Sequence, residues 1–271
     1  MDSIRRFEFN TIYIIESLDS DDKKTGELLY HDLLRWKQLQ ITYFNSELIQ
    51  VNSRSEFFHG LEQIKSKSGF ENYPYIHFEI HGSKDGFVLN SDEQVTWEEV
   101  ANRCRELNRI CKNNLHVSLA TCFGAYILKE IKPFDISPFW GFIGPWEVVK
   151  DHDIMVSFQT FFECMFTDDL QNINLFNCIE QLNYSNANLP WRFNFYNAEQ
   201  VFDKAYENYE ETHYQPEALK QRINNLMARG LSDINIRNST TIPQLRQQIE
   251  TYIIDNREKI RKAMYKKFMM E

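Results

Sequence analysis

The sequence predicts an α/β fold, in which a mostly parallel central sheet carries helices on both faces and a helical extension follows. Stretches with strand-like and helix-like apolar patterns alternate over about residues 1–200, and parallel strands need such crossovers between them. The predicted strands are rich in apolar residues, as strands covered on both faces are. Later residues are charged, with apolar positions at helical spacing. We therefore expect an α/β domain over residues 1–200 and a helical C-terminal extension over residues 201–271.

The first predicted elements are a strand, a helix and a second strand. Residues 11–18 (TIYIIESL) are rich in Ile and contain no strand breaker. Apolar residues recur at helical spacing over residues 27–39, and residues 41–44 follow as a short strand-like stretch. Ser53, with a Glu three residues later, is typical of a helix N-cap, so we expect a further helix that ends near Gly69.

The next predicted elements carry the side chains that could take part in a reaction. Residues 74–81 (PYIHFEIH) alternate in the strand period, and residues 82–89 predict a hairpin-like return. Thr96, again with a Glu three residues later, predicts the start of a helix. Residues 115–122 (LHVSLATC) predict another buried strand, and a glycine two residues later indicates a sharp exit from the sheet. The pattern continues with strands at residues 139–144 and 191–196 and with a helix at residues 153–166.

The composition is that of a folded protein without a basic nucleic-acid surface. Hydrophobic residues make up 42% of the 271 residues, and 21 Phe and 13 Tyr provide material for a sizeable core. A net charge of −9 opposes contact with phosphates, so we expect no direct nucleic-acid partner. The absence of an 18-residue apolar tract predicts no membrane span. Residues 1–9 lack the apolar run of a signal peptide, so we expect a cytoplasmic location.

The five cysteines predict reduced thiols. None forms a CxxC pair, which argues against a structural zinc site, and cysteines in a cytoplasm stay reduced. Four of them are expected to be buried and inert: Cys104, Cys111, Cys164 and Cys178. Cys122 differs because it lies at the end of a predicted strand.

His81 and Cys122 each end a predicted strand, and functional residues of parallel sheets gather at the carboxyl ends of strands. A thiol attacks as the thiolate, so it needs a base nearby. Gly82 would let a substrate carbonyl approach the backbone closely, and the N–H groups of Gly82 and Cys122 are natural donors to an oxyanion. From these residues alone, two interpretations stay equally open. Cys122 and His81 form a catalytic dyad, or Cys122 is an ordinary core cysteine and His81 an ordinary surface histidine.

The sequence resembles the caspase-like (clan CD) cysteine peptidases, closest to CHAT- and separase-type domains, in three ordered segments: IHFEIHGSKDGFVL, LHVSLATCFGA and FWGFIGPWEVVKDHDIM. In that group one apolar strand ends in His-Gly and a second ends in Cys, at a spacing similar to the 41 residues between His81 and Cys122. The resemblance covers about residues 10–200. Phe123 departs from the pattern because it is bulkier than usual, and Glu147 stands in place of Asp.

The resemblance implies a thiol protease, an endopeptidase that cleaves a protein substrate through a thioester. Cys122 would be its nucleophile and His81 the donor of a proton to the leaving amine. The group generally lacks an essential third member, and its chemistry needs no cofactor and no metal. Small prokaryotic members resemble enzymes that a partner subunit activates in antiviral defence or cell-death modules, where the target is a gasdermin-like pore former. We expect a protein substrate and an activating partner of this kind.

The segment after residues 139–144 holds candidate substrate-binding residues. In separases an acidic residue in this loop binds a basic side chain, and Asp151 and Asp153 lie at the matching place. Carboxylates at a helix start are also ordinary caps. Met155 stands where separases have an acidic residue, so an apolar or mixed pocket stays open.

Two rival functions follow from other features. His77, Glu79 and His81 alternate on one strand face, which would suit a metal-dependent hydrolase with His116 as a further ligand. The same alternation would let His77 or Glu79 orient His81, although an exposed strand end is the simpler interpretation. The second rival is a non-catalytic caspase-like scaffold that binds partners.

Apolar residues also recur at helical spacing from Thr241 to the C-terminus. This pattern predicts a helix that packs on the domain or on a partner. Acidic residues share the helix with lysines, so we expect no membrane binding.

Overall fold

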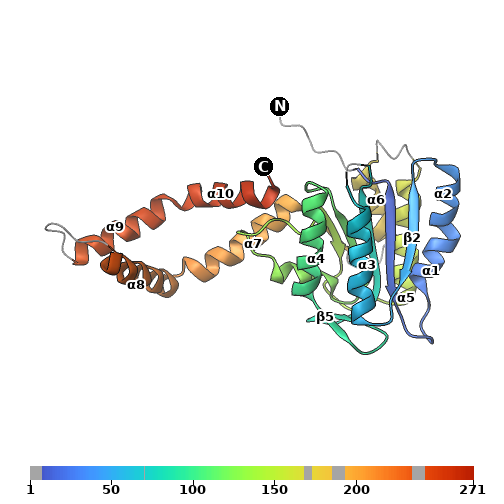
Figure 1. Ribbon diagram of the computed structural model, residues 1–271, viewed down its shortest axis with the longest axis horizontal. Helices are drawn as coiled ribbons and strands as arrows, with labels where there is room; N and C mark the ends of the chain where they lie inside the picture. The colour runs from blue at the N-terminus through green and yellow to red at the C-terminus, as the bar shows by residue number, and fades with distance from the viewer. Residues whose placement is uncertain (1–7, 70, 168–172, 185–192, 234–241) are drawn as a thin grey trace. The chain divides into compact units, whose positions relative to one another are not determined.

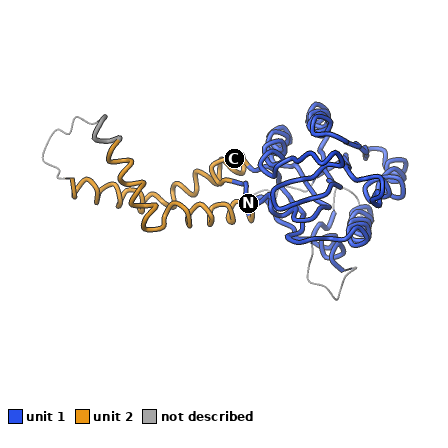
Figure 2. Tube along the Cα trace, turned by 90° about the horizontal axis from the view of Figure 1, so that it is seen from below, with its two compact units in different colours: residues 1–131, 137–199 blue, residues 132–136, 200–271 orange. Residues whose placement is uncertain are grey.

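The computed structural model describes residues 8–69, 71–167, 173–184, 193–233 and 242–271. The chain forms two compact units, one of residues 1–131 and 137–199 and the other of residues 132–136 and 200–271 (Figure 2). Among the described residues, no helix is long and apolar enough to cross a lipid bilayer.

The first unit is built on a mixed, mostly parallel sheet with the strand order β2-β1-β3-β6-β7-β8. The first five of these strands pair in parallel, β8 is antiparallel to β7, and a β4–β5 hairpin continues from the end of β3. This arrangement confirms the predicted α/β class with its mostly parallel sheet. The strands are β1 (Thr11–Ser17), β2 (Asn45–Gln50), β3 (Pro74–Gly82), β4 (Gly86–Val88), β5 (Gln94–Thr96), β6 (His116–Leu119), β7 (Gly141–Gly144) and β8 (Asn194–Asn197).

Helices cover both faces of this sheet (Figure 1). Adjacent residues of β3 show the two faces, because the His77 ring lies 4.5 Å from the Phe158 ring while the Phe78 ring lies 6.0 Å from the Phe57 ring. The Phe158 face carries α1 (Thr25–Leu29), which continues through a π-helical turn (Tyr30–Leu34) into α2 (Arg35–Gln40), together with α5 (Asp151–Met165) and α6 (Leu175–Tyr184). The Phe57 face carries α3 (Arg54–Lys67) and α4 (Trp97–Ile110).

Both predicted N-caps are confirmed. The Ser53 hydroxyl accepts a hydrogen bond from the Glu56 N–H at 3.2 Å. At the start of α4, Thr96 and Glu99 form a reciprocal capping box. The two caps fix where the helices of the Phe57 face begin.

The second strand lies at Asn45–Gln50, so its prediction at residues 41–44 was wrong. Residues 41–44 form a turn, in which the Phe44 N–H donates to the Ile41 carbonyl at 3.1 Å. β2 is an edge strand with mixed burial, so its sequence NSELIQ carries no continuous apolar signal.

Two other predicted strands differ in extent from the observed ones. The strand predicted at residues 115–122 ends at Leu119, which leaves Cys122 in the following turn. The strand predicted at residues 191–196 is observed as β8, and its first two residues lie outside the described part of the chain.

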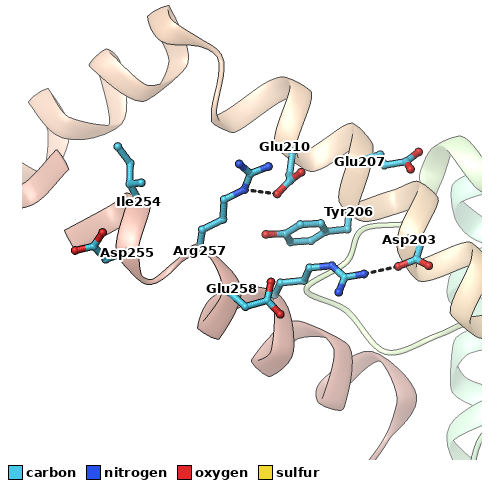
Figure 3. A pocket seen from close by; sticks show the side chains of 9 residues that line it. Asp203, Tyr206, Glu207, Glu210, Ile254, Asp255, Arg257 and Glu258 are labelled. Atoms are coloured by element: carbon cyan, nitrogen blue, oxygen red, sulfur yellow. Dashed lines mark hydrogen bonds and ion pairs between the residues drawn. The ribbon is translucent and has the colours of Figure 1, made fainter. Parts of the chain in front are cut away.

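The second unit is helical, and the C-terminal helical region predicted from sequence is therefore present. The single helical pattern after Thr241 divides at Asn256 into two helices. Ile223 and Met227 pack with Ile253 in a small core. Arg257 pairs with Glu210 at 2.5 Å and Arg261 pairs with Asp203 at 2.6 Å, beside an open cavity of about 740 Å³ (Figure 3). The helices are α7 (Ala198–His213), α8 (Pro216–Asp233), α9 (Ile242–Asp255) and α10 (Arg257–Met269).

Candidate active site

The register between β3 and β6 brings the predicted dyad to one edge of the sheet. Phe78 lies opposite Leu119 in this parallel pair, and the Ala120 N–H donates to the Phe78 carbonyl at 2.9 Å, which extends the ladder. Residues that face each other across the two strands are 41 positions apart. The paired register ends at Phe78 and Leu119, and His81 and Cys122 each lie three residues beyond this last pair.

Gly82 lies directly against the Cys122 backbone. A Cβ atom built on Gly82 would be 2.2 Å from the Cys122 carbonyl oxygen and 2.3 Å from Thr121 Oγ1, so no side chain fits at this position. The close approach places the backbones of Gly82 and Cys122 together. These are the two residues whose N–H groups the sequence assigns to an oxyanion site.

Cys122 lies at a sharp turn out of the strand. The next residue, Phe123, has φ of 59° and ψ of 19°, which is the left-handed region that non-glycine residues rarely adopt. A short 3₁₀ helix (Gly124–Glu130) follows at once. The Phe123 ring packs edge-on against the Tyr126 ring at 5.7 Å, which accommodates the bulk of this side chain in the turn. Strained backbone of this kind is often found at functional sites.

The Cys122 side chain is half-buried and contacts the segment that follows β7. Its sulfur lies 3.5 Å from the Val149 amide nitrogen and 3.6 Å from the Val149 carbonyl oxygen. The Phe123 N–H donates to the Glu147 carbonyl at 3.1 Å and fixes the same segment. The thiol can donate to the Val149 carbonyl, and a thiolate can accept from the Val149 amide.

His81 is half-exposed, and its Nε2 atom lies 2.7 Å from Asp22 Oδ2. The hydrogen bond with His81 is the main cause that lowers the pKa of the Asp22 carboxyl. Sequence reasoning missed Asp22. The sequence did contain a signal for it, the acidic run DSDD at the carboxyl end of β1. Since β1 pairs with β3 on the side opposite β6, this run lies at the same edge of the sheet as His81.

His77 and Glu79, on the same strand face, form a separate buried network. His77 Nδ1 lies 2.7 Å from Ser118 Oγ, and its Nε2 lies 2.9 Å from Glu79 Oε1. The Thr25 hydroxyl donates to Glu79 Oε2 at 2.7 Å. Neither residue orients His81, since the ring of His81 is held by Asp22.

The rival metal site of His77, Glu79 and His81 is not assembled. In the described part of the chain, one set of three metal-binding side chains has its ligand atoms within 4.8 Å of one another, and it is Asp19, Asp22 and His81. The other suggested ligand, His116, is fully buried, and burial lowers its pKa to about 3. The alternation along the strand correctly predicted that His77 and Glu79 share a face. It could not predict that buried hydrogen bonds use both ring nitrogens of His77.

The three candidate substrate-binding residues do not converge on one site. Asp151 begins α5 and is exposed, whereas Asp153 in the same first turn is buried. Met155 is half-buried and lines a narrow cavity of about 30 Å³ with Thr25 and Glu79, room for about one water molecule. Of the three, Asp153 is the carboxylate that lies in a desolvated position.

Three of the four remaining thiols are buried, as predicted. Cys104 and Cys111 are buried, and burial raises the pKa of each to about 12. Cys178 is also buried. The prediction of burial was wrong for Cys164, which is half-buried and whose sulfur accepts a hydrogen bond from Asn177 Nδ2 on α6 at 3.3 Å.

The fold and this edge of the sheet define an α/β protein with a histidine near the end of one parallel strand and a cysteine in the turn that follows the adjacent strand. The chain matches no known family model and no curated protein sequence.

Proposed function

We propose that the chain is a caspase-like cysteine endopeptidase with Cys122 as nucleophile and His81 as base. The β3–β6 register carries this proposal, because it sets the end of the strand that holds His81 beside the end of the strand that leads to Cys122. The absence of space for a side chain at Gly82 supports it, since the backbones of Gly82 and Cys122 lie in close contact there. The family resemblance of the same residues adds to the argument.

The proposed reaction is acyl transfer. His81 takes the thiol proton, and the Cys122 sulfur forms a bond to the scissile carbonyl carbon. The N–H groups of Gly82 and Cys122 stabilise the resulting oxyanion. As the C–N bond breaks, the His81 imidazolium gives its proton to the leaving amine, which leaves a thioester on Cys122. Water then hydrolyses the thioester, with His81 again as base, and restores the free thiol.

The proposal is tested by mass spectrometry of the products from a peptide library. The wild-type chain should cleave peptides, and Cys122→Ala and His81→Ala should abolish cleavage. Cys164→Ala is the matched control, because Cys164 is also a half-buried thiol but lies at the C-terminal end of α5, whereas the Val149 segment that contacts Cys122 precedes the N-terminal end of that helix. Full cleavage by a folded Cys122→Ala variant would refute the assignment.

An alternative is a non-catalytic scaffold that uses the same fold to bind partners. An electrophilic acyl probe separates the two, because a catalytic Cys122 reacts with it only when His81 is present. The proposed setting, a prokaryotic antiviral or cell-death module with an activating partner and a gasdermin-like target, rests on the resemblance alone. Cleavage that begins only after the partner is added would support that setting.

A further inference from the structure

We propose that Asp22 is the positioning residue for His81, so that the dyad operates as an Asp22–His81–Cys122 relay across three neighbouring strands. This inference rests on the proposed function and extends it to a residue that the family pattern does not supply. The three residues follow β1, end β3 and follow β6, which are adjacent parallel strands. Their order across the sheet is therefore the order that a relay needs.

The contact between Asp22 and His81 determines which ring nitrogen is free. Asp22 Oδ2 lies 2.7 Å from His81 Nε2. The lowered pKa of the Asp22 carboxyl keeps it ionised near neutral pH, and an ionised carboxylate only accepts hydrogen bonds. The proton of a neutral ring is therefore held on Nε2. Nδ1 then carries the lone pair that can take the proton of the Cys122 thiol.

The Asp22 carboxylate is oriented before it meets His81. Its Oδ2 atom also accepts from the Asp19 N–H at 2.8 Å, and the Asp22 N–H donates to the Asp19 carbonyl at 3.1 Å. The Lys24 ammonium donates to the same Asp19 carbonyl at 2.6 Å and to the Leu18 carbonyl. These bonds close a turn that holds the carboxylate in one direction.

The segment that carries Asp22 is anchored in the sheet at both ends. It follows β1 directly, and it leads into α1 at Thr25, whose hydroxyl donates to Glu79 Oε2 at 2.7 Å. Glu79 lies two residues before His81 on β3. The buried network of Glu79 with His77 therefore fixes the distance between the Asp22 turn and the strand that ends in His81.

A purely structural ion pair explains this arrangement less well. The side chains of His81 and Asp22 are 50% and 34% exposed, and exposed pairs contribute at most about 1 kcal/mol to stability. The surrounding bonds instead restrict the direction of the carboxylate, which matters for the orientation of a ring. Asp19 and Lys24, from the same turn, are charged neighbours of Asp22.

The test compares Asp22→Asn with the matched control Asp21→Asn. Asp21 belongs to the same acidic run and is exposed, with the Ser20 hydroxyl at 3.4 Å as its contact. Asparagine keeps the size of aspartate and the backbone bond from residue 22 to the Asp19 carbonyl, so the turn should remain folded. It lacks the charge, and its amide can present either an acceptor oxygen or a donor NH2 group at the position of Oδ2, so it no longer fixes the tautomer of His81. Asp22→Glu restores the charge and serves as the rescue variant.

The first measurement is nitrogen NMR of the histidine rings, with the His81 signals identified by their absence in His81→Gln. The wild type and Asp21→Asn should show the Nε2–H tautomer of His81, and Asp22→Asn should lose that preference. An unchanged tautomer in Asp22→Asn would overturn the inference, whether or not the chain is a peptidase.

The second measurement is the rate at which iodoacetamide alkylates Cys122 near neutral pH, followed by mass spectrometry of its peptide. Asp22→Asn should slow this reaction by roughly tenfold or more, while Asp21→Asn stays within about twofold and Asp22→Glu recovers part of the rate. Equal rates in Asp22→Asn and Asp21→Asn would refute the positioning role. If His81→Ala also left the rate unchanged, the Cys–His proposal itself would fail, which keeps the two failures distinct.

Discussion

Both backbone polar groups of Val149 contact the Cys122 sulfur, the amide nitrogen at 3.5 Å and the carbonyl oxygen at 3.6 Å. The carbonyl suits the neutral thiol, and the amide suits the thiolate, since a thiolate only accepts hydrogen bonds. Both ionisation states of Cys122 therefore find a backbone partner without a change in the fold. This arrangement differs from that of the other cysteines in ways that experiments can detect.

The first prediction concerns the selectivity of thiol labelling. Brief treatment of the folded chain with iodoacetamide at about pH 8 should modify Cys122 first and leave Cys104 and Cys111 unmodified. Burial raises the pKa of the latter two to about 12 and removes them from solvent. Peptide mass spectrometry measures the extent of labelling at each site. Modification of Cys104 at the rate of Cys122 would contradict the structure.

The second prediction concerns Gly82. In Gly82→Ala the added Cβ would meet the Cys122 carbonyl oxygen at 2.2 Å, so the turn at Cys122 has to shift. A shift of this size at the reacting atoms should lower cleavage by roughly a hundredfold. Gly69→Ala is the control, because a Cβ there meets nothing within 4 Å. Equal activity of the two variants, measured with one peptide substrate, would rule out a role for the Gly82 backbone.

Local chemistry in the sequence was sufficient for much of this site. The alternation in PYIHFEIH and the apolar stretch LHVSLATC predicted two buried strands, and His81 and Cys122 were assigned from their ends. The 41-residue spacing was informative because it equals the register of β3 on β6. That equality required the two strands to be neighbours, which the sequence did not state.

Features that depend on packing between distant segments could not be predicted in this way. Asp22 contacts His81 across 59 residues of sequence, and only the position of β1 beside β3 brings them together. The edge strand β2 was misplaced because an edge strand is half-exposed and lacks an apolar run. His77 and Glu79 suggested a metal because their partners Ser118 and Thr25 lie on other elements.

The third prediction concerns the buried network and metal dependence. His77→Ala should destabilise the chain by roughly 3 kcal/mol or more in urea unfolding, because Glu79 is then left buried without one of its partners. His59→Ala, on the exposed side of α3, is the control for the loss of a histidine in this unfolding experiment.

Chelators should leave cleavage unchanged, since the proposed mechanism uses the thiol and imidazole alone. Activity that is lost with a chelator and restored by zinc would instead support a metal-dependent hydrolase.

The fourth prediction concerns the pH dependence of stability. Burial, the largest effect, raises the pKa of Glu16, and the charge of Glu79 adds to it, while the Glu27 amide, Gln50 and Lys24 oppose the shift. The folded state therefore binds the Glu16 proton more tightly than the unfolded state. The stability that this proton provides is complete below the ordinary pKa of about 4.5 and is lost as the pH rises through the folded value.

Glu16→Gln removes this titration while it keeps a side chain of the same size. The variant should therefore melt a few degrees above the wild type near pH 7, and the difference should disappear near pH 4. Glu47→Gln is the control, because Glu47 is an exposed partner of Lys67 and should change the melting temperature little. A stability difference between Glu16→Gln and the wild type that does not vary with pH would contradict this account.

The last prediction concerns substrate preference, and it separates the two carboxylates at the start of α5. Asp151 is exposed, so Asp151→Ala should cost at most about 1 kcal/mol of stability through the helix dipole and leave specificity unchanged.

Asp153 is buried, and a desolvated carboxylate that faces a substrate Lys or Arg is costly to remove. If Asp153 fills the substrate-binding role, Asp153→Ala should lower cleavage after basic residues by roughly a hundredfold and spare cleavage after apolar ones. Cleavage-site profiles of the wild type and both variants measure this directly. A wild-type preference for Leu or Met before the scissile bond would exclude the acidic pocket and point to Met155, which lines the narrow cavity beside Glu79.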